Sequence, residues 1–273
     1  MKGIDKMKVI KIKLDRGIKK IKIITLADLH IGDKNCDMEL VESLIKTVSQ
    51  KDYYCILNGD ILDNAIVDSV GNTYDESLNP MRQLEYVIEM LRPIKDKILC
   101  ITGGNHEERT NRKVGIDLSL LIASSLGLRN RYCEDGSGVV FLSLGNLDGT
   151  KETNGSGKNR QVAYTLYVSH GRRSGIGIGS KINALKQYEN VVTNCDVYIG
   201  SHTHQASIFP TSTFEVDTRN HTIYRRNKLF LSNGSCIDYG GYAEQNNYQP
   251  NSMIYPVLEL NGTKKLMSAS LEI

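Results

Sequence analysis

The sequence predicts a layered α/β domain, and three observations lead to this prediction. Short apolar strands alternate with segments of helical periodicity over the first two thirds of the chain. The last third is richer in short strands, which we expect at residues 229–231, 254–260 and 265–273. The 273 residues contain no internal repeat and no linker rich in proline and serine, so we expect one domain over residues 1–273.

The chain begins with two β-like runs, residues 9–14 and 21–26, which are separated by the turn residues Asp15-Arg16-Gly17. This pattern predicts a hairpin, with residues 1–19 forming an N-terminal edge strand. The lysines that alternate along the first run are typical of a solvated sheet edge.

The spacing of apolar residues predicts the elements that follow. Helices are expected at residues 36–49, 84–91, 116–126 and 182–191, and strands at residues 53–57, 98–101, 139–144, 163–169 and 197–199. Pro93 and Gly127 mark the ends of the second and third helices. Residues 145–157 are polar and rich in glycine, and are expected to form a loop.

Composition excludes several classes of protein. The net charge is +3, which does not favour a general polyanion binder. None of the six cysteines forms a CxxC pair, so we expect reduced thiols in a cytosolic protein. The charges scattered through the N-terminal residues do not favour a secretory signal, and we expect no membrane span because no apolar run is long enough. We therefore expect a soluble cytoplasmic protein without a membrane partner.

Polar clusters follow five of the predicted strands. The clusters are Asp28-Leu29-His30, Gly59-Asp60-Ile61-Leu62-Asp63, Gly104-Asn105-His106-Glu107, His170-Gly171 and Gly200-Ser201-His202-Thr203-His204. They hold five of the six histidines, and only His221 lies elsewhere. Ligands of open α/β sheets bind beyond the carboxyl ends of the strands, so we expect the clusters to form one site.

The residue types in these clusters indicate a metal site. Imidazole and carboxylate ligands together suit divalent Mn, Fe, Zn or Ni. No thiolate is present among them, which argues against a structural zinc site. Asp28 and His30 are two residues apart, so on a strand both side chains would face the same side and reach one ion.

Taken together, the five motifs resemble those of the calcineurin-like metallophosphoesterases, and they run in that family's order from residue 28 to residue 204. The chain also resembles phosphoesterases of bacterial and phage genomes that are described as exonuclease-like. The resemblance implies a four-layer α-β-β-α sandwich with two mixed sheets. It also implies a binuclear metal centre at the strand ends.

The resemblance assigns a role to each motif residue. Asp28, His30 and His204 are expected to bind one ion, Asp60 to bridge both ions, and Asn105, His170 and His202 to bind the other. His106 is expected to contact the substrate or the leaving group. Asp63 and Glu107 either position the ligands and His106 through hydrogen bonds or only stabilise turns. The expected cofactors are two divalent ions, with Mn as first choice and Fe, Zn or Ni as alternatives. These ions would activate a bridging hydroxide that attacks phosphorus.

The sequence says less about the substrate. A glycine-rich loop with Arg172, Arg173 and Lys181 follows His170, and Arg109 follows the Asn105-His106 motif. Such basic residues are suited to bind phosphate, although a glycine-rich segment can also be a solvated linker. Three functions stay open: a phosphodiesterase that acts on DNA, RNA or nucleotides, a phosphomonoesterase such as a protein phosphatase, and a non-catalytic scaffold. We favour the first.

Overall fold

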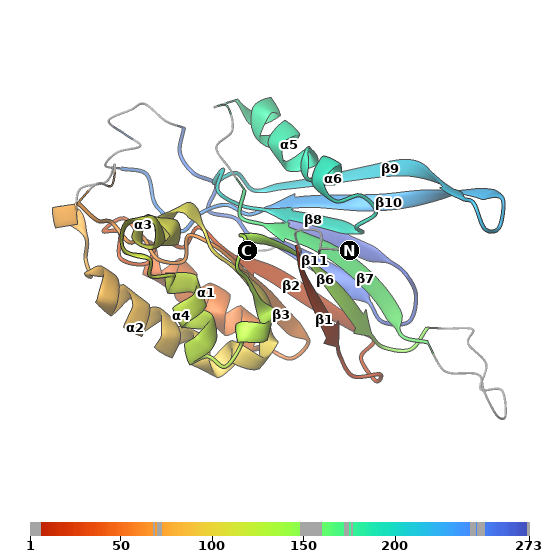
Figure 1. Cartoon of the computed structure of the whole chain (residues 1–273), viewed down its shortest axis with the longest axis horizontal. Coiled ribbons are helices and arrows are strands. Elements are labelled where there is room, and N and C mark those ends of the chain that lie inside the picture. The colour runs from red at the N-terminus through yellow and green to blue at the C-terminus, as the bar shows by residue number, and fades with distance from the viewer. Residues whose placement is uncertain are drawn as a thin grey trace.

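Two six-stranded sheets stacked face to face form the centre of the protein (Figure 1). The computed structural model describes residues 7–67, 69, 73–147, 160–171, 175, 177–240, 244 and 249–271. In spatial order, the first sheet contains β1 (Lys8–Lys13), β6 (Ser137–Leu144), β7 (Val162–Ser169), β8 (Val197–Gly200), β10 (Thr222–Ser232) and β9 (Ser207–Asp217). The second contains β12 (Met267–Leu271), β11 (Pro256–Asn261), β2 (Lys20–Leu26), β3 (Tyr53–Asn58), β4 (Ile98–Thr102) and β5 (Tyr132–Cys133). Both sheets combine parallel and antiparallel pairs.

Side chains alternate between two apolar layers along the central strands. In β2, Ile21 and Ile23 pack between the sheets, whereas Ile24 and Leu26 face the helices. This alternation follows from the strand period of two residues, and it explains why the strand is apolar on both faces. A third apolar cluster, on the outer face of the first sheet, includes Phe230.

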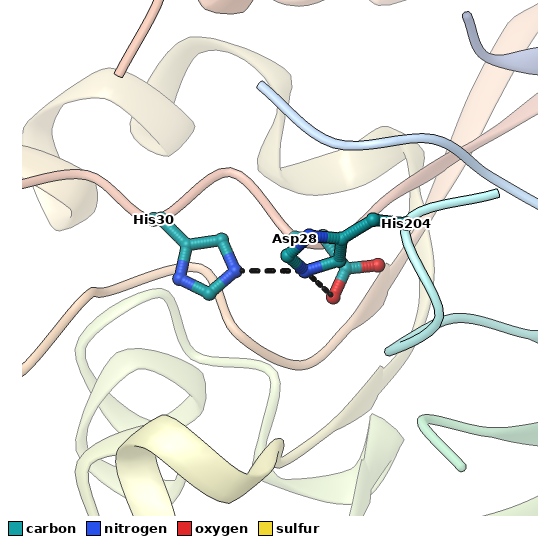
Figure 2. A group of neighbouring side chains, drawn as sticks. All are labelled: Asp28, His30 and His204. Carbon is teal, nitrogen blue, oxygen red and sulfur yellow. Dashed lines mark hydrogen bonds and ion pairs between the residues drawn. The ribbon is translucent and has the colours of Figure 1, made fainter. Parts of the chain in front are cut away.

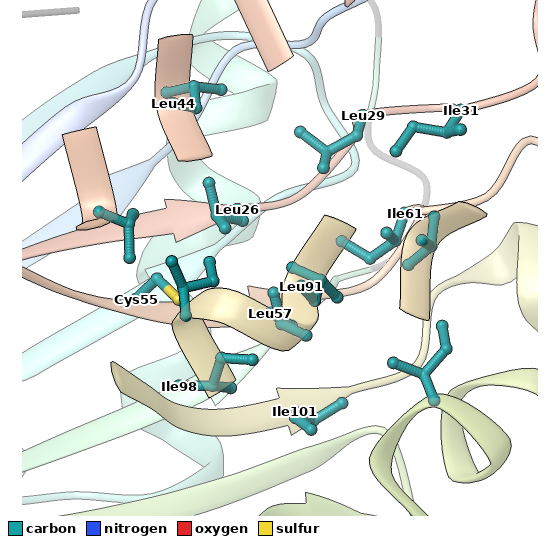
Figure 3. Packing of buried hydrophobic residues seen from close by; sticks show 14 of the residues in the cluster. Leu26, Leu29, Ile31, Leu44, Cys55, Leu57, Ile61, Leu91, Ile98 and Ile101 are labelled. Carbon is teal, nitrogen blue, oxygen red and sulfur yellow. The ribbon is translucent and has the colours of Figure 1, made fainter. Parts of the chain in front are cut away.

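Helices cover the outer face of each sheet. The face of the second sheet packs against α1 (Met38–Ser49), α2 (Pro80–Leu91) and α4 (Leu118–Ser125), as Figure 3 shows in part. The face of the first sheet packs against α5 (Ile178–Lys186) and α6 (Tyr188–Val191). The remaining elements are α3 (Asn105–Val114) and the short 3₁₀ helices η1 (Thr73–Asp75), η2 (Arg92–Lys97) and η3 (Arg129–Arg131). The expected four-layer α-β-β-α sandwich is therefore confirmed.

The predicted N-terminal hairpin is wrong. β1 lies at the edge of the first sheet and pairs in parallel with β6, whereas β2 lies inside the second sheet between β11 and β3. The turn at residues 15–17 thus carries the chain from one sheet to the other. The two strands separate because β2 is apolar on both faces and needs a layer on each, while β1 with its lysines suits an edge.

The structure also contains elements that the sequence did not predict. Helix α3 follows β4 directly, and the region predicted as one helix at 182–191 is divided between α5 and α6. β9 and β10 form an antiparallel hairpin of 11-residue strands that extends past its neighbours (Figure 1). Of the predicted loop at 145–157, only residues 145–147 lie within the described part. Among the described residues, no helix has both the length and the apolar character needed to cross a membrane.

Candidate metal centre

The predicted site residues converge at the carboxyl ends of β2, β3, β4, β7 and β8. Five of them have left-handed backbone conformations with φ between 49° and 69°, namely Asp28, His30, Asp60, His202 and His204. Such conformations are strained for residues with a Cβ and concentrate at functional sites. Asp28 and His30 therefore meet through backbone turns beyond the end of β2 and not through strand alternation, so that part of the expectation is wrong.

The first ligand group consists of Asp28, His30 and His204 (Figure 2). His30 Nε2 lies 3.2 Å from His204 Nε2, and His204 Nε2 lies 3.5 Å from Asp28 Oδ1. Asp28 and His30 are buried, while the His204 side chain is 23% exposed. The group therefore presents two imidazole nitrogens and one carboxylate oxygen to a common point.

The second ligand group consists of Asp60, His170 and His202. His170 Nε2 lies 3.1 Å from Asp60 Oδ2 and 3.2 Å from the Asn105 side-chain oxygen. Asn105 is exposed at the first turn of α3, so it can close this group from the solvent side.

A third set of side chains lies between these groups and consists of His30, Asp60 and His106. The His30 and His106 rings meet edge to face with centroids 4.3 Å apart, and His106 Nε2 lies 3.9 Å from Asp60 Oδ2. Asp60 thus belongs to two of the three sets and lies between the first and second ligand groups. This is the place that a bridging carboxylate requires.

Three histidines of the two ligand groups hold Nδ1 against an oxygen and direct Nε2 into the centre. The oxygen partners are Asp63 Oδ1 for His30 at 3.0 Å, the Asn58 carbonyl for His170 at 2.6 Å, and Asn251 Oδ1 for His204 at 3.3 Å. An oxygen acceptor keeps the proton on Nδ1 and leaves the Nε2 lone pair free, which is the usual arrangement of metal-binding histidines. The donor set of imidazole nitrogens and buried carboxylates therefore fits two divalent ions.

Asp63 connects His30 with His106. Its Oδ1 lies 3.0 Å from His30 Nδ1 and 3.1 Å from His106 Nδ1, and His106 Nδ1 also lies 2.6 Å from the Asp63 carbonyl. Burial raises the pKa of Asp63, but the hydrogen bonds from both histidines outweigh it and hold the pKa well below its ordinary value. Arg109 donates to His106 Nε2 at 2.9 Å, so it contacts a predicted catalytic side chain.

Glu107 contacts backbone amides and not the ligand side chains. Its carboxylate accepts from the N–H groups of Asp60, Ile61, Leu62 and Gly104 at 2.7–3.0 Å. The side chain thereby fixes the turn that carries Asp60. Gly104 is equally constrained, because a Cβ at this position would lie 2.2 Å from Asp60 Oδ1.

The charges of the centre oppose the effect of burial at two residues. Without bound ions, burial lowers the pKa of His170, but the charge and hydrogen bond of Asp60 outweigh it and raise the pKa to about 10, so an ion would have to displace the proton from Nε2. Conversely, His170 and His106 hold the pKa of Asp60 well below its ordinary value despite burial. Burial and the neighbouring His170 lower the pKa of His202 to about 4.

The remaining predicted residues are placed in part. Lys181 donates to the Thr203 carbonyl at 2.9 Å, next to both His202 and His204. Arg172 and Arg173 lie outside the described residues. His221 lies in the turn between β9 and β10 and belongs to none of the five polar clusters.

Sequence reasoning missed several polar residues that support the ligands. Asn233 Nδ2 donates to Asp28 Oδ2 at 3.0 Å, and Asn58 holds His170 through its carbonyl. Asn233 follows the apolar end of β10 in the run Ser232-Asn233-Gly234-Ser235. The signal that identified the other clusters, a polar run after an apolar strand, was therefore present here as well.

The sequence model of calcineurin-like phosphoesterases matches residues 21–206, so the chain belongs to this family. It is 24% identical over 244 residues to an uncharacterized metallophosphoesterase of Helicobacter pylori, which covers 84% of the chain. The chain spans 58% of the length of that relative.

The chain is also similar, at low sequence identity, to several solved structures. A predicted phosphoesterase from Streptococcus pneumoniae is 14% identical with a TM-score of 0.37, covering 94% of this chain and 100% of its own. A Vps29 variant from Entamoeba histolytica is 12% identical with a TM-score of 0.35, covering 93% and 100%. A metallophosphoesterase from Sphaerobacter thermophilus is 12% identical with a TM-score of 0.36, covering 89% and 84%.

Proposed function

We propose that this chain is a binuclear metal-dependent phosphodiesterase that acts on nucleic acid or nucleotides. The observation that carries the proposal is the pair of ligand groups, Asp28–His30–His204 and Asp60–His170–His202, with Asp60 between them. In this proposal Asp60 would be shared by the two ions, and Asn105 would complete the second group. Mn²⁺ is the proposed metal, with Fe, Zn and Ni as alternatives for the same donor set.

Two divalent ions, when bound, supply an activated water and neutralise the phosphoryl oxygens. The ligand side chains would hold the two ions at fixed places, and burial of Asp28 and Asp60 would strengthen their attraction to the ions. We propose that His106 acts at the leaving oxygen through Nε2, by donating a proton or by stabilising negative charge, once the Arg109 guanidinium that donates to Nε2 in this structure has turned to the substrate phosphate. Asp63 is the positioning residue for His106, since it holds Nδ1.

Burial lowers the pKa of His106, but the charges of Asp60 and Asp63 outweigh burial and raise it. In the protein without bound ions, a raised pKa favours the protonated imidazole that a general acid requires, a form that Nε2 reaches only when Arg109 no longer donates to it. We propose Glu107 as a positioning residue for Asp60 rather than a reacting group. In the hydrogen bonds described above, the partners of its carboxylate are all backbone amides.

The preference for diesters is supported by basic residues near the ligand groups. Arg109 contacts His106, and Lys181 contacts the backbone between His202 and His204. Arg172 and Arg173 follow His170 in the sequence and extend this basic character. Each is proposed to bind a phosphate of the substrate. A single domain over residues 1–273 and a cytoplasmic location belong to the same proposal.

A panel of substrates assayed with Mn²⁺ tests the proposed function. The panel contains bis-p-nitrophenyl phosphate, p-nitrophenyl phosphate, single- and double-stranded DNA, RNA and cyclic nucleotides. We expect hydrolysis of the diester probe and of at least one nucleic acid or nucleotide. Hydrolysis of p-nitrophenyl phosphate alone would instead establish a phosphomonoesterase. Two bound ions without hydrolysis of any probe would support the scaffold function.

A further inference from the structure

Five buried side chains form a continuous hydrogen-bonded chain that ends on Asp28. Thr102 Oγ1 donates to Asn58 Oδ1 at 2.8 Å, and Asn58 Nδ2 donates to Ser201 Oγ at 2.6 Å. Ser201 Oγ donates to Asn233 Oδ1 at 2.7 Å, and Asn233 Nδ2 donates to Asp28 Oδ2 at 3.0 Å. None of the five residues is more than 3% exposed. Every donor faces the same direction, so the chain is polarised toward the carboxylate.

This series of hydrogen bonds joins the strand ends of both sheets. Thr102 and Asn58 are the last residues of β4 and β3 in the second sheet. Ser201 and Asn233 directly follow β8 and β10 in the first sheet. A buried polar network that satisfies its members is rigid, because each broken hydrogen bond leaves an unpaired group in a medium of low dielectric constant.

Asn233 shares the Oδ2 atom of Asp28 with the His202 backbone N–H, which lies 3.0 Å from Oδ2 and 3.2 Å from Oδ1. The amide oxygen of Asn233 faces the Ser201 hydroxyl, and its amide nitrogen also contacts the carbonyls of Ala27 and Gly234 at 3.2 and 2.6 Å. The reverse orientation would place the amide oxygen against these acceptors. With Oδ2 bonded to Asn233 and to the His202 N–H, Asp28 directs Oδ1 toward His204 Nε2 at 3.5 Å.

Asn58 connects the same series of hydrogen bonds to the second ligand group. Its carbonyl accepts from His170 Nδ1 at 2.6 Å, while its side chain leads through Ser201 to Asn233. The Asn58 amide is held independently of Thr102, because its nitrogen also donates to the Ser169 carbonyl at 3.0 Å. Thr102 is therefore the link whose loss should disturb Asp28 least.

We propose that Asn233 is a positioning residue that sets the affinity of the Asp28–His30–His204 group for its divalent ion, with Ser201 holding the Asn233 amide. The inference rests on the proposed function, since it assumes that these ligands bind an ion. Partners of metal ligands typically change metal affinity by a factor of about 10 to 100 when they are removed.

Calorimetric titration with Mn²⁺ in the absence of substrate tests this inference. His204→Ala and His202→Ala first assign the two binding events to the two ligand groups. We expect Asn233→Ala to weaken the event that depends on His204 by about 10- to 100-fold and to change the other event by less than about 3-fold. Ser201→Ala should weaken the same event by a smaller factor, and Ser201→Thr, which restores the hydroxyl, should recover it. Thr102→Val is the matched control, and both its events should match the wild type.

Three results would overturn the inference: unchanged affinity in folded Asn233→Ala, an equal loss in both events, or the same selective loss in Thr102→Val. If thermal melting shows that Asn233→Ala is unfolded, Ser201→Ala decides the question, and unchanged affinity in that variant is equally contradictory. Wild-type protein that binds two ions but hydrolyses no phosphoester contradicts the proposed activity alone. The calorimetric comparison is unaffected by that outcome.

Discussion

The Nε2 atoms of His30 and His204 lie 3.2 Å apart, although 174 positions separate the two residues in the chain. Both rings turn Nδ1 toward an oxygen, of Asp63 and of Asn251 respectively. Two imidazole lone pairs directed at one point repel each other, and a divalent cation between them converts this repulsion into attraction. The relationship makes His204 the most informative ligand to remove.

Replacement of His204 by alanine should reduce the bound Mn²⁺ from two ions to one per chain. We expect kcat/KM for bis-p-nitrophenyl phosphate to fall by about 100-fold or more, because one ion contributes several kcal/mol of transition-state stabilisation. Metal analysis and steady-state kinetics measure the two effects. His221→Ala is the matched control, since this exposed histidine lies in the β9–β10 turn. Two ions retained in His204→Ala would contradict the ligand assignment.

Replacement of His106 by alanine should separate turnover from metal binding. The proposed role at the leaving oxygen predicts a fall in kcat of about 10²- to 10⁴-fold. The metal content should stay at two ions, because His106 is not one of the proposed ligands. Metal analysis beside steady-state kinetics checks both expectations. Full activity, or loss of the ions, would show that the role of His106 is assigned wrongly.

Gly104→Ala should damage the centre without removing any ligand. The added Cβ would lie 2.2 Å from Asp60 Oδ1 and 2.3 Å from the Asp60 nitrogen, so Asp60 has to move. We expect a loss of about 1–3 kcal/mol in the free energy of unfolding. Both Mn²⁺ affinities should also fall, because Asp60 is the proposed bridge.

Gly179→Ala provides the control for Gly104→Ala. Gly179 lies within α5, and a Cβ there meets nothing within 4 Å. The same substitution should therefore raise the free energy of unfolding slightly, by about 0.4–1 kcal/mol, and leave metal binding unchanged. Urea unfolding and calorimetry compare the two variants. Wild-type Mn²⁺ affinity in Gly104→Ala would show that Asp60 tolerates the displacement.

The sequence predicts those parts of the fold that depend on the local periodicity of apolar residues. The buried runs of β2 and β3 and the helical spacing of α1 depend on local periodicity, so they are visible in the sequence. The partner of β1 is not visible, because a turn signal does not specify whether the next strand joins the same sheet. β9 carries polar and apolar residues in a long exposed hairpin, so no strong apolar run marks it.

The site residues could also be predicted where a local sequence pattern marks them. Polar clusters after apolar strands identify Asp28, Asp60 and His170, because the strand ends meet in space. Asn233 carries the same signal, a polar run after the apolar end of β10, whereas Asn251 has no distinctive spacing in the sequence. Their roles depend on orientation across two sheets, which only the three-dimensional structure contains.

Glu76 is a titrating group beside the centre. Burial and the neighbouring Asp63 raise its pKa to about 8 from an ordinary value of 4.5, and Gln83 Nε2 donates to its carboxyl at 2.6 Å. Between these two pH values the folded protein holds a proton that the unfolded chain has lost. The contribution of this group to the free energy of unfolding is therefore fully present below pH 4.5, and it is lost as the pH rises through about 8.

Glu76→Gln should remove this pH dependence, because glutamine keeps its polar contacts and cannot lose a proton. In metal-free protein we expect the stability of the variant relative to the wild type to increase with pH. The difference should reach on the order of 1 kcal/mol at about pH 8, after allowance for solvent screening of a half-exposed side chain. Urea unfolding in EDTA at several pH values measures it. Glu85→Gln is the control, since Glu85 is an exposed partner of Arg82. A difference for Glu76→Gln that stays constant with pH would show that Glu76 is already ionised in the folded protein.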